Sequence, residues 1–246
     1  MYKASVRIFI GLTVASLCII AYLATRAAAQ SGSNAFTSVF PNETSFVTSG
    51  TNPFWILTPG FHEVLEGQKS GNTSKVDITV TSGTLTTADG FPTRIVHELD
   101  YVNGQLIETT DDYLAISTRT NSVYYFGGFA TQYQNGQVVG HSGSWESGVN
   151  GAHFGMLMPG AVLLGARFQQ EVAPGITLDQ SQIVNMEVST TVPVGTFQHC
   201  VVLLDTSGVP PTGHAETKVF CPGIGEVQDE EVVLTQCSGA GTTACP

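Results

Sequence analysis

Short alternations of apolar and polar residues run through most of the chain, and turn-forming residues separate them. Asp89-Gly90, Asn103-Gly104 and Asn135-Gly136 are dipeptides of the kind that supply the positive φ angles of tight hairpins. Thr120-Asn121-Ser122 indicates a fourth turn. The segments between these turns are rich in Thr, Val, Ile and Tyr, which suit a pleated, half-buried surface. The pattern therefore predicts consecutive antiparallel strands.

The predicted strands form two sets, separated by a long loop at 148–160. They cover residues 75–86, 93–102, 105–118, 122–133, 137–145, 162–172, 181–192, 196–205, 217–221 and 225–236. No stretch past residue 29 keeps a helical period, and 27 glycines and 11 prolines disfavour long helices. A sheet of about ten strands tends to curl. We therefore predict an all-β antiparallel meander that forms an up-and-down barrel or a strongly bent half-barrel, with a two-sheet β-sandwich as the alternative.

The first 29 residues have the layout of a secretory signal peptide. Lys3 and Arg7 precede a nearly unbroken apolar run at 8–23, and Ala27-Ala28-Ala29 supplies small residues for cleavage. As a helix that run spans roughly 24 Å, which is less than the roughly 30 Å of a bilayer core. We expect cleavage and an extracytoplasmic protein, secreted or periplasmic, that meets the membrane only transiently. An uncleaved N-terminal anchor is the alternative.

By composition, the rest of the chain has three parts, and no linker between separate domains is evident. Residues 30–50 are rich in Ser, Thr and Asn and are expected to form a flexible N-terminal segment. Residues 51–236 are expected to form a single β domain, and residues 237–246 a tail closed by a disulfide.

The charge of the chain argues against nucleic acid as a partner. Removal of residues 1–29 changes the formal net charge from −11 to −14, because three basic residues and no acidic one lie there. Such a surface repels phosphate backbones, and the remaining basic residues are scattered along the chain.

Four cysteines remain beyond the signal segment and allow three pairings. A hairpin centred between Pro210 and Pro211 places Cys200 opposite Cys221, at about the Cβ separation that a disulfide needs. Cys237 and Cys245 would then close a small loop. Free thiols are the alternative, but disulfides are typical of exported proteins.

No catalytic, cofactor or metal motif stands out. The acids Glu98, Asp100, Glu108, Asp111 and Asp112 gather around one hairpin, where a two-residue turn would pair Val96 with Asp111. A solvated acidic face is the favoured interpretation, with a hydrolase that uses Asp111 and Asp112 as an alternative. The six histidines show no metal-binding spacing, and the segment 140–144 lacks the second glycine of the serine hydrolase elbow.

Aromatic residues are concentrated in the middle of the chain. Neighbouring strand residues point to opposite faces, so Tyr124 and Phe126 share one face and Tyr125 lies on the other. One set must line the interior, either as packed core, which is the more common outcome, or as the wall of an apolar cavity. The residues that could line such a cavity are Tyr113, Tyr124, Phe126, Trp145 and Phe154.

Short motifs give the chain a family resemblance over residues 52–231. The motifs are 52–60 (NPFWILTPG), 192–197 (VPVGTF) and 222–227 (PGIGEV), supported by 125–127 (YFG) and 144–146 (SWE). Together they resemble an uncharacterised family of exported bacterial β-rich proteins, akin to lipoprotein-carrier-like curved β-sheet envelope proteins. The resemblance implies no catalytic residue. Cys221 departs from the family pattern, which implies that its bridge to Cys200 is an addition in this chain.

The function that these observations favour is that of a non-enzymatic exported protein of the cell envelope. We expect it to bind a lipid or another apolar or amphipathic ligand in a curved β-sheet. A structural or protein-interaction module, acting through loops such as 148–160, is one alternative. A hydrolase with acidic residues is the other.

Overall fold

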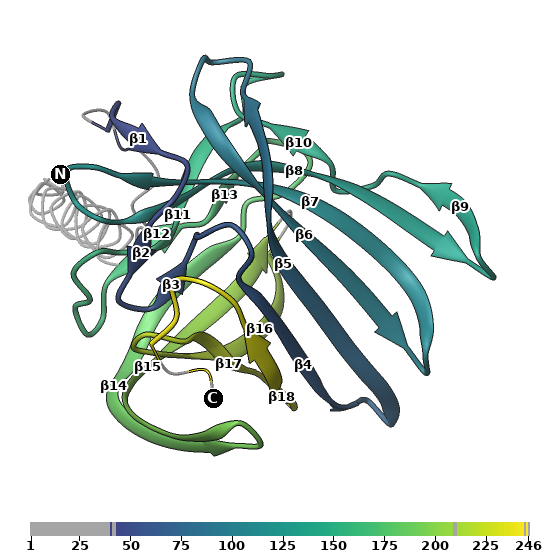
Figure 1. Ribbon diagram of the computed structural model, residues 1–246. Coiled ribbons are helices and arrows are strands. Elements are labelled where there is room, and N and C mark those ends of the chain that lie inside the picture. Colours follow the sequence, from purple (N-terminus) through teal and green to yellow (C-terminus); the bar gives the residue numbers. More distant parts are fainter. Residues whose placement is uncertain (1–39, 41–42, 209–210, 244, 246) are drawn as a thin grey trace, which may run out of the picture. The chain divides into compact units, whose positions relative to one another are not determined.

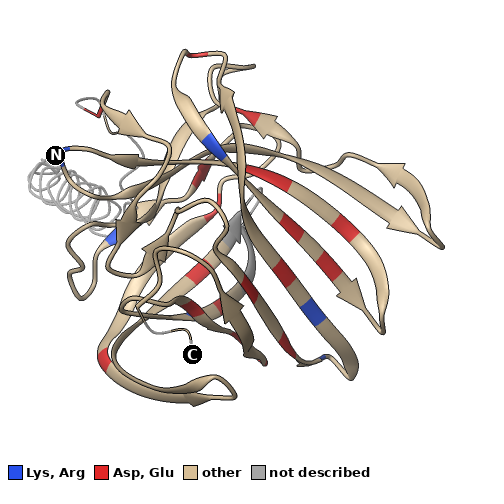
Figure 2. Ribbon diagram, in the orientation of Figure 1, with Lys and Arg blue, Asp and Glu red and all other residues tan. Residues whose placement is uncertain are grey.

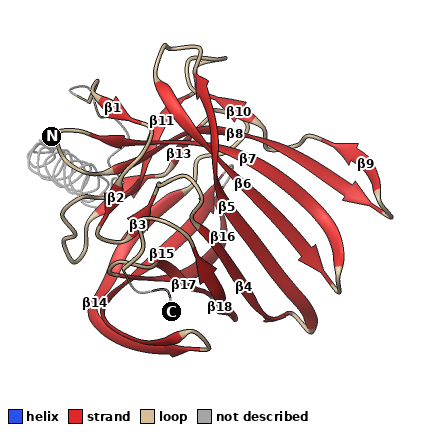
Figure 3. Ribbon diagram, viewed as in Figure 1, coloured by secondary structure: helices blue, strands red, loops and turns tan. Residues whose placement is uncertain are grey.

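The computed structural model describes residues 40, 43–208, 211–243 and 245. The chain divides into residues 1–36 and residues 37–246, and all described residues belong to the second unit. The predicted signal peptide at 1–29 therefore lies outside the described residues. Within the described part of the chain the regular elements are all strands, as Figure 3 shows.

The strands in the described residues vary from two to fifteen residues in length. They are β1 (Phe46–Val47), β2 (Thr51–Asn52), β3 (Trp55–Ile56), β4 (His62–Lys69), β5 (Asn72–Thr86), β6 (Pro92–Val102), β7 (Gln105–Ser117), β8 (Val123–Gln134), β9 (Gln137–Gly140), β10 (Trp145–Glu146), β11 (His153–Met158), β12 (Arg167–Gln169), β13 (Glu171–Val172), β14 (Gln180–Val192), β15 (Gly195–Gly208), β16 (Pro211–Cys221), β17 (Gly225–Asp229) and β18 (Val232–Ser238).

One antiparallel sheet contains most of these strands, in the order β12-β14-β15-β16-β17-β18-β4-β5-β6-β7-β8-β11-β13 (Figure 1). Two sequential meanders, β4–β8 and β14–β18, join where β18 pairs with β4. The sheet nearly closes into a barrel, with a single seam between the edge strands β12 and β13. This confirms the predicted all-β meander of the barrel type.

Two of the predicted hairpin turns, both at Asn-Gly, are confirmed by their backbone angles. Asn103 and Gly104 have φ values of 52° and 76°, and Asn135 and Gly136 have values of 54° and 75°. Positive φ at both central residues is the geometry that Asn-Gly supplies at low cost. Local turn chemistry therefore sets the β6–β7 and β8–β9 connections.

Several strands differ from the prediction. Strand β4 was not predicted, because its buried Val64 and Leu65 are adjacent and give no alternation. The range 148–160 is not one long loop, since β11 lies within it and pairs with β8. The single strand predicted at 225–236 is a hairpin, β17–β18, that turns where Glu230 has a φ of 50°.

Two further segments adopt more strand than predicted. Strand β15 continues to Gly208 and strand β16 begins at Pro211, within a segment where a loop was expected. A proline is tolerated at the first position of a strand. Strand β1 lies in the segment expected to be flexible and pairs with the end of β7.

Both predicted disulfides are present. Cys200 bonds to Cys221, with their Cα atoms 4.2 Å apart, and Val201 pairs with Phe220 in the register that the hairpin argument required. Cys237 bonds to Cys245 across eight positions of the C-terminal tail. The Cys237 end of this bridge belongs to β18, so the bridge attaches the tail to the sheet.

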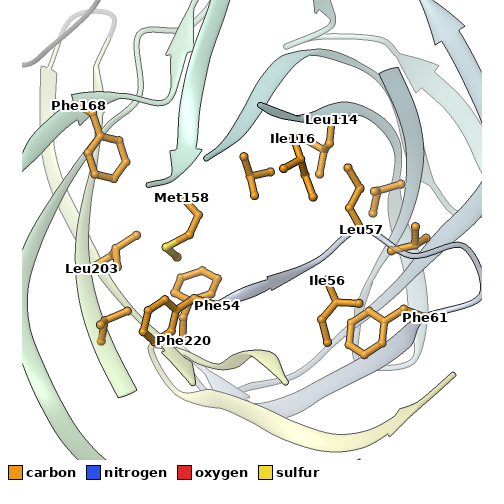
Figure 4. Packing of buried hydrophobic residues seen from close by; sticks show 14 of the residues in the cluster. Phe54, Ile56, Leu57, Phe61, Leu114, Ile116, Met158, Phe168, Leu203 and Phe220 are labelled. Atoms are coloured by element: carbon orange, nitrogen blue, oxygen red, sulfur yellow. The ribbon is translucent and has the colours of Figure 1, made fainter. Parts of the chain in front are cut away.

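A hydrophobic core fills part of the sheet's interior (Figure 4). The segment around β2–β3 supplies Phe54, Ile56 and Leu57, which pack against strand residues such as Leu114 and Leu203. The inward side chains of single strands change character along their length. On β7, the inward face passes from Leu114 to Asp112, and on β15 it passes from Leu203 to Asp205. The interior therefore has an apolar part and an acidic part.

Candidate ligand cavity

The acidic part of the interior encloses a cavity of about 620 Å³. This volume lies within the range of small-molecule binding sites. Seven acidic side chains line the cavity, with Lys218 as the basic one among the described residues: Glu63, Glu98, Glu108, Asp112, Glu171, Asp179 and Glu226. Aromatic and aliphatic residues complete the wall, among them Trp55, Ile78, Tyr125 and Leu157. We call this space the acidic cavity.

A β-bulge decides which acids of β7 face the acidic cavity. The two-residue turn pairs Val102 with Gln105, but Ile107 is an extra residue on β7, and beyond it Asp100 pairs with Glu108. Val96 consequently pairs with Asp112 and not, as predicted, with Asp111. Because a one-residue shift moves every later side chain to the other face, Asp112 turns inward.

The acids of this hairpin are therefore divided between two faces and do not form one solvated face. Glu98, Glu108 and Asp112 line the acidic cavity. Asp111 lies on the other face, where its Oδ1 is 2.6 Å from Nδ1 of His97. Figure 2 shows how often Asp and Glu recur across the neighbouring strands β4–β7.

Asp112 is held by Tyr125, whose hydroxyl donates a hydrogen bond of 2.7 Å to Oδ1 of the carboxylate. Burial raises the pKa of Asp112 to about 6, while this hydrogen bond lowers it. Gly128, opposite Asp112 on β8, leaves room for the pair, since an added Cβ would lie 2.8 Å from both Asp112 Oδ1 and Tyr125 Oη. Asp112 is thus a carboxyl group that changes charge near neutral pH.

Glu63 and Glu226 approach the acidic cavity from β4 and β17. Glu63 is 7% exposed, and its Oε2 has no hydrogen-bond partner among the described residues. Burial, and after it the charge of Glu226, raises the pKa of Glu63 well above its ordinary value. Burial raises the pKa of Glu226 to about 7, although Lys218 lowers it.

Lys218 is the basic side chain of this wall, and acids surround it. Its Nζ lies 3.4 Å from Asp229 Oδ2 and 3.7 Å from Glu226 Oε1. Burial lowers the pKa of Lys218, but the charges of Glu226, Asp229 and other acids raise it well above its ordinary value. Lys218 therefore stays cationic, and its charge is already compensated.

Two more carboxyl groups of the cavity wall have strongly raised pKa values. Burial, followed by the charge of Asp100, raises the pKa of Glu98 well above its ordinary value. Burial raises the pKa of Glu171 to about 8, although a hydrogen bond from Thr177 lowers it. Desolvation disfavours a charged carboxylate, so part of this wall carries protons at pH 7.

Exposed residues mark where the acidic cavity meets the solvent. Ser142 and Gly143 are exposed, and Ile176 is 45% exposed, yet all three line the cavity. They belong to the segments that follow β9 and β13. A small molecule can therefore reach the interior between these two segments.

The aromatic residues that the sequence singled out lie elsewhere. Tyr124, Phe126 and Phe154 pack with Phe46 and Phe91 in an aromatic cluster, with ring centroids 4.8–5.7 Å apart. Tyr113 is partly buried against the same cluster. None of these side chains is among the described residues that line the acidic cavity.

Trp145, the fifth residue, packs with Ala152, Ala173 and Tyr125 beside the cavity. Tyr125 and Phe126 do lie on opposite faces of β8, as the alternation predicts, but Tyr125 is the one that faces the acidic cavity. Alternation separates the two faces of a strand without indicating which of them is interior. Trp55 was also missed as a cavity residue, although it lies in the 52–60 motif.

The remaining candidates for chemistry are dispersed. In the part of the chain that the structure describes, no three His, Cys, Asp or Glu side chains are grouped so as to hold a metal ion. Ser144, in the segment 140–144, accepts a hydrogen bond from the backbone N–H of Ala130 on β8. That serine thus has a structural role in joining this segment to β8. The described residues also contain no helix long and apolar enough to cross a membrane.

No family model and no curated protein matches the sequence. Two solved structures show partial likeness. A Bacteroides fragilis protein described as a candidate exported protein with a YmcC-like fold is 12% identical, covers 80% of this chain and 100% of its own, and has a TM-score of 0.37. A candidate lipoprotein of Parabacteroides distasonis is 13% identical over the same shares, with a TM-score of 0.36. Likeness this distant does not establish a common fold, so the family resemblance of the sequence stays a prediction.

Proposed function

We propose that this protein is a non-enzymatic, extracytoplasmic binding protein that holds a small amphipathic molecule in the acidic cavity. The observation that carries the proposal is the cavity itself, about 620 Å³ in volume and open to solvent beside Ser142 and Ile176. Two disulfides support a location outside the reducing cytosol.

The composition of the wall supports an amphipathic ligand over a purely apolar one. Leu157, Ile78 and Trp55 offer apolar surface, while carboxyl groups from several strands offer hydrogen-bond acceptors and negative charge. An entirely apolar ligand would remove water from those carboxyl groups without replacing their hydrogen bonds, which is costly. A purely apolar lipid is therefore a weaker candidate than a small molecule with both apolar and polar parts.

Titration with a fluorescent amphipathic probe tests the proposal. Monodansylcadaverine, an amine with an aromatic body, is expected to bind saturably at about one molecule per chain. Thr110→Phe places a ring on the cavity wall and is expected to weaken binding at least tenfold, because the ring occupies the ligand's space. Thr109→Phe, on the other face of β7, is the matched control and should bind like the parent. Absence of saturable binding to the folded parent protein would refute the proposal.

A hydrolase is the second candidate, favoured by one observation. Asp112 and Glu171 line the same cavity, and burial raises their pKa values to about 6 and about 8. Carboxyl groups that titrate near neutral pH are suited to general acid–base catalysis. Turnover of chromogenic glycosides that is lost in Asp112→Asn and kept in Asp111→Asn would support this function. Equal rates in both variants would exclude Asp112 as its acid or base.

A further inference from the structure

We infer that the acidic cavity selects an organic cation, namely an amine whose ammonium group binds Glu63 and whose carbon body lies against Trp55. This inference rests on the proposed function, because it names the ligand class of the same cavity. The Glu63 carboxylate would then recognise the charge of the ligand, and the Trp55 indole would recognise its shape.

The first step is that Glu63 lacks a partner that its burial requires. It is 7% exposed, and its Oε2 has no hydrogen-bond partner within the described residues. A buried carboxylate oxygen that accepts no hydrogen bond is destabilising, and its partner is often a ligand or an ion. Glu63 lines the acidic cavity, and a rotation of its side chain that turns the buried Oε2 toward this space would let a ligand supply the missing donor.

The second step concerns charge. Lys218 is the basic residue of the wall, and its ammonium group lies near Glu226 and Asp229. The wall thus holds seven acidic residues and one lysine among the described residues, and the charge of that lysine is already compensated by Glu226 and Asp229. A second cation in the cavity would be attracted by the unpaired Glu63 and by Glu226 beside it, whose charges act on one another.

The third step concerns the surroundings of Glu63. A narrow space behind the cavity is shared by Glu63, Trp55, Ile78 and Val96, so the carboxylate lies where acidic and apolar walls meet. The Trp55 ring stacks on Phe220, with centroids 5.7 Å apart and an interplanar angle of 25°, which fixes the indole's orientation. An indole face binds ammonium groups and apolar carbon alike. Calcium, by contrast, prefers six to eight oxygen ligands.

The pKa values of the wall supply an independent signature. Burial raises the pKa of Glu226 to about 7, so this group is partly protonated near pH 7, and burial raises the pKa of Glu63 above its ordinary value. A bound ammonium group favours their charged forms, and binding should therefore release protons. Affinity for an amine should rise between pH 6 and pH 8, as long as the amine itself stays protonated.

The test compares monodansylcadaverine with its N-acetyl derivative, in which a neutral amide replaces the ammonium group. We expect the amine to bind at least tenfold more tightly. Glu63→Gln should weaken binding of the amine by about tenfold to a hundredfold, the range for a hydrogen bond to a charged group, and change binding of the acetylated probe less than twofold. Glu66→Gln, on the same strand but outside the cavity wall, is the control.

Further measurements keep the outcome interpretable. Glu63→Asp retains the charge and should keep the preference for the amine, which separates loss of charge from loss of folding. Calorimetry in two buffers of different ionisation enthalpy should detect proton release with the amine alone.

The outcomes separate the two proposals. Equal affinity for both probes, or no effect of Glu63→Gln, would refute the cation site while leaving a binding cavity in place. Saturable binding of neither probe would refute the proposed function as well. Equimolar displacement of the amine by Ca²⁺, with loss of that effect in Glu63→Gln, would assign the site to a metal and overturn the inference.

Discussion

At the scale of single residues, Arg94 shows how a charged side chain supports an irregular part of the sheet. It is 7% exposed and lies beside a bulge of β5, where the pairing with β6 shifts between Val80 and Thr84. Its guanidinium group donates hydrogen bonds to the carbonyl oxygens of Ser82, Gly83 and Thr48 at 2.8–3.2 Å. Arg94 thereby satisfies carbonyl groups that the bulge removes from the regular ladder.

Replacement of this arginine should be costly. Arg94→Ala is expected to lower the free energy of unfolding by about 2–4 kcal/mol, because three partly buried carbonyl groups lose a charged donor at once and the buried arginine leaves a cavity. Urea denaturation of parent and variant measures the difference. Lys75→Ala serves as control, since Lys75 forms a surface ion pair with Asp77 at 2.9 Å, and such pairs contribute about 1 kcal/mol or less. Similar losses in both variants would show that the buried contacts are unimportant.

At the scale of elements, the β15–β16 hairpin carries a bridge that closes a loop of 21 positions between Cys200 and Cys221. Both cysteines are fully buried, and they pack in a second hydrophobic core cluster with Leu65, Ile224 and Leu234. The bridge thus joins β15 to β16, and it lies in the core cluster that also includes residues from the paired strands β18 and β4.

Loss of this bridge should destabilise the protein. The double variant Cys200→Ala/Cys221→Ala is expected to cost about 3 kcal/mol, chiefly because the unfolded chain gains freedom, and the lost packing adds to that cost. Denaturation under non-reducing conditions measures the change. Cys237→Ala/Cys245→Ala, which opens a loop of eight positions, should cost less. A larger loss from the shorter loop would contradict this account.

At the scale of the whole molecule, the acidic cavity makes stability depend on pH. Burial raises the pKa of Asp112 from 3.8 to about 6 and that of Glu171 from 4.5 to about 8. Between the unfolded and the folded values, the folded protein holds protons that the unfolded chain has released. The free energy of unfolding therefore falls as the pH rises through this range.

We expect the ligand-free protein to be most stable near pH 4–5 and to lose stability between pH 5 and pH 8. The midpoint of thermal unfolding should fall by several degrees over that interval, since 1 kcal/mol corresponds to about 2–4 °C in a domain of this size. In Glu171→Gln the fall should be smaller, because this group no longer loses a proton. A midpoint that rises toward pH 8 in the parent protein would contradict the protonated cavity.

The hairpin elements of this molecule could be predicted because their determinants are local. Asn103-Gly104 and Asn135-Gly136 form the predicted turns, and Cys200 and Cys221 meet because a hairpin register follows from counting. Strand β4 was not predicted. It pairs with a strand on each side, and several adjacent residues are buried, so apolar and polar residues do not alternate along it.

The acidic cavity could not be predicted by counting residues from a turn. Its charged wall depends on Ile107, one extra residue that turns Asp112 inward and leaves Asp111 beside His97. Its Glu63 carboxylate approaches Glu226 because β4 and β17 lie on either side of β18 in the sheet, although they are far apart in sequence. Neither feature has a local signal.

The amino-acid sequence by itself determined the class of fold, the hairpin turns and the disulfide pairs, because each depends on neighbouring residues or on simple strand periodicity. The tertiary structure decided which face of each strand became interior, where the sheet closed and which acids came together. Those outcomes depend on bulges and on contacts between distant strands, and a single inserted residue reverses every side chain that follows it.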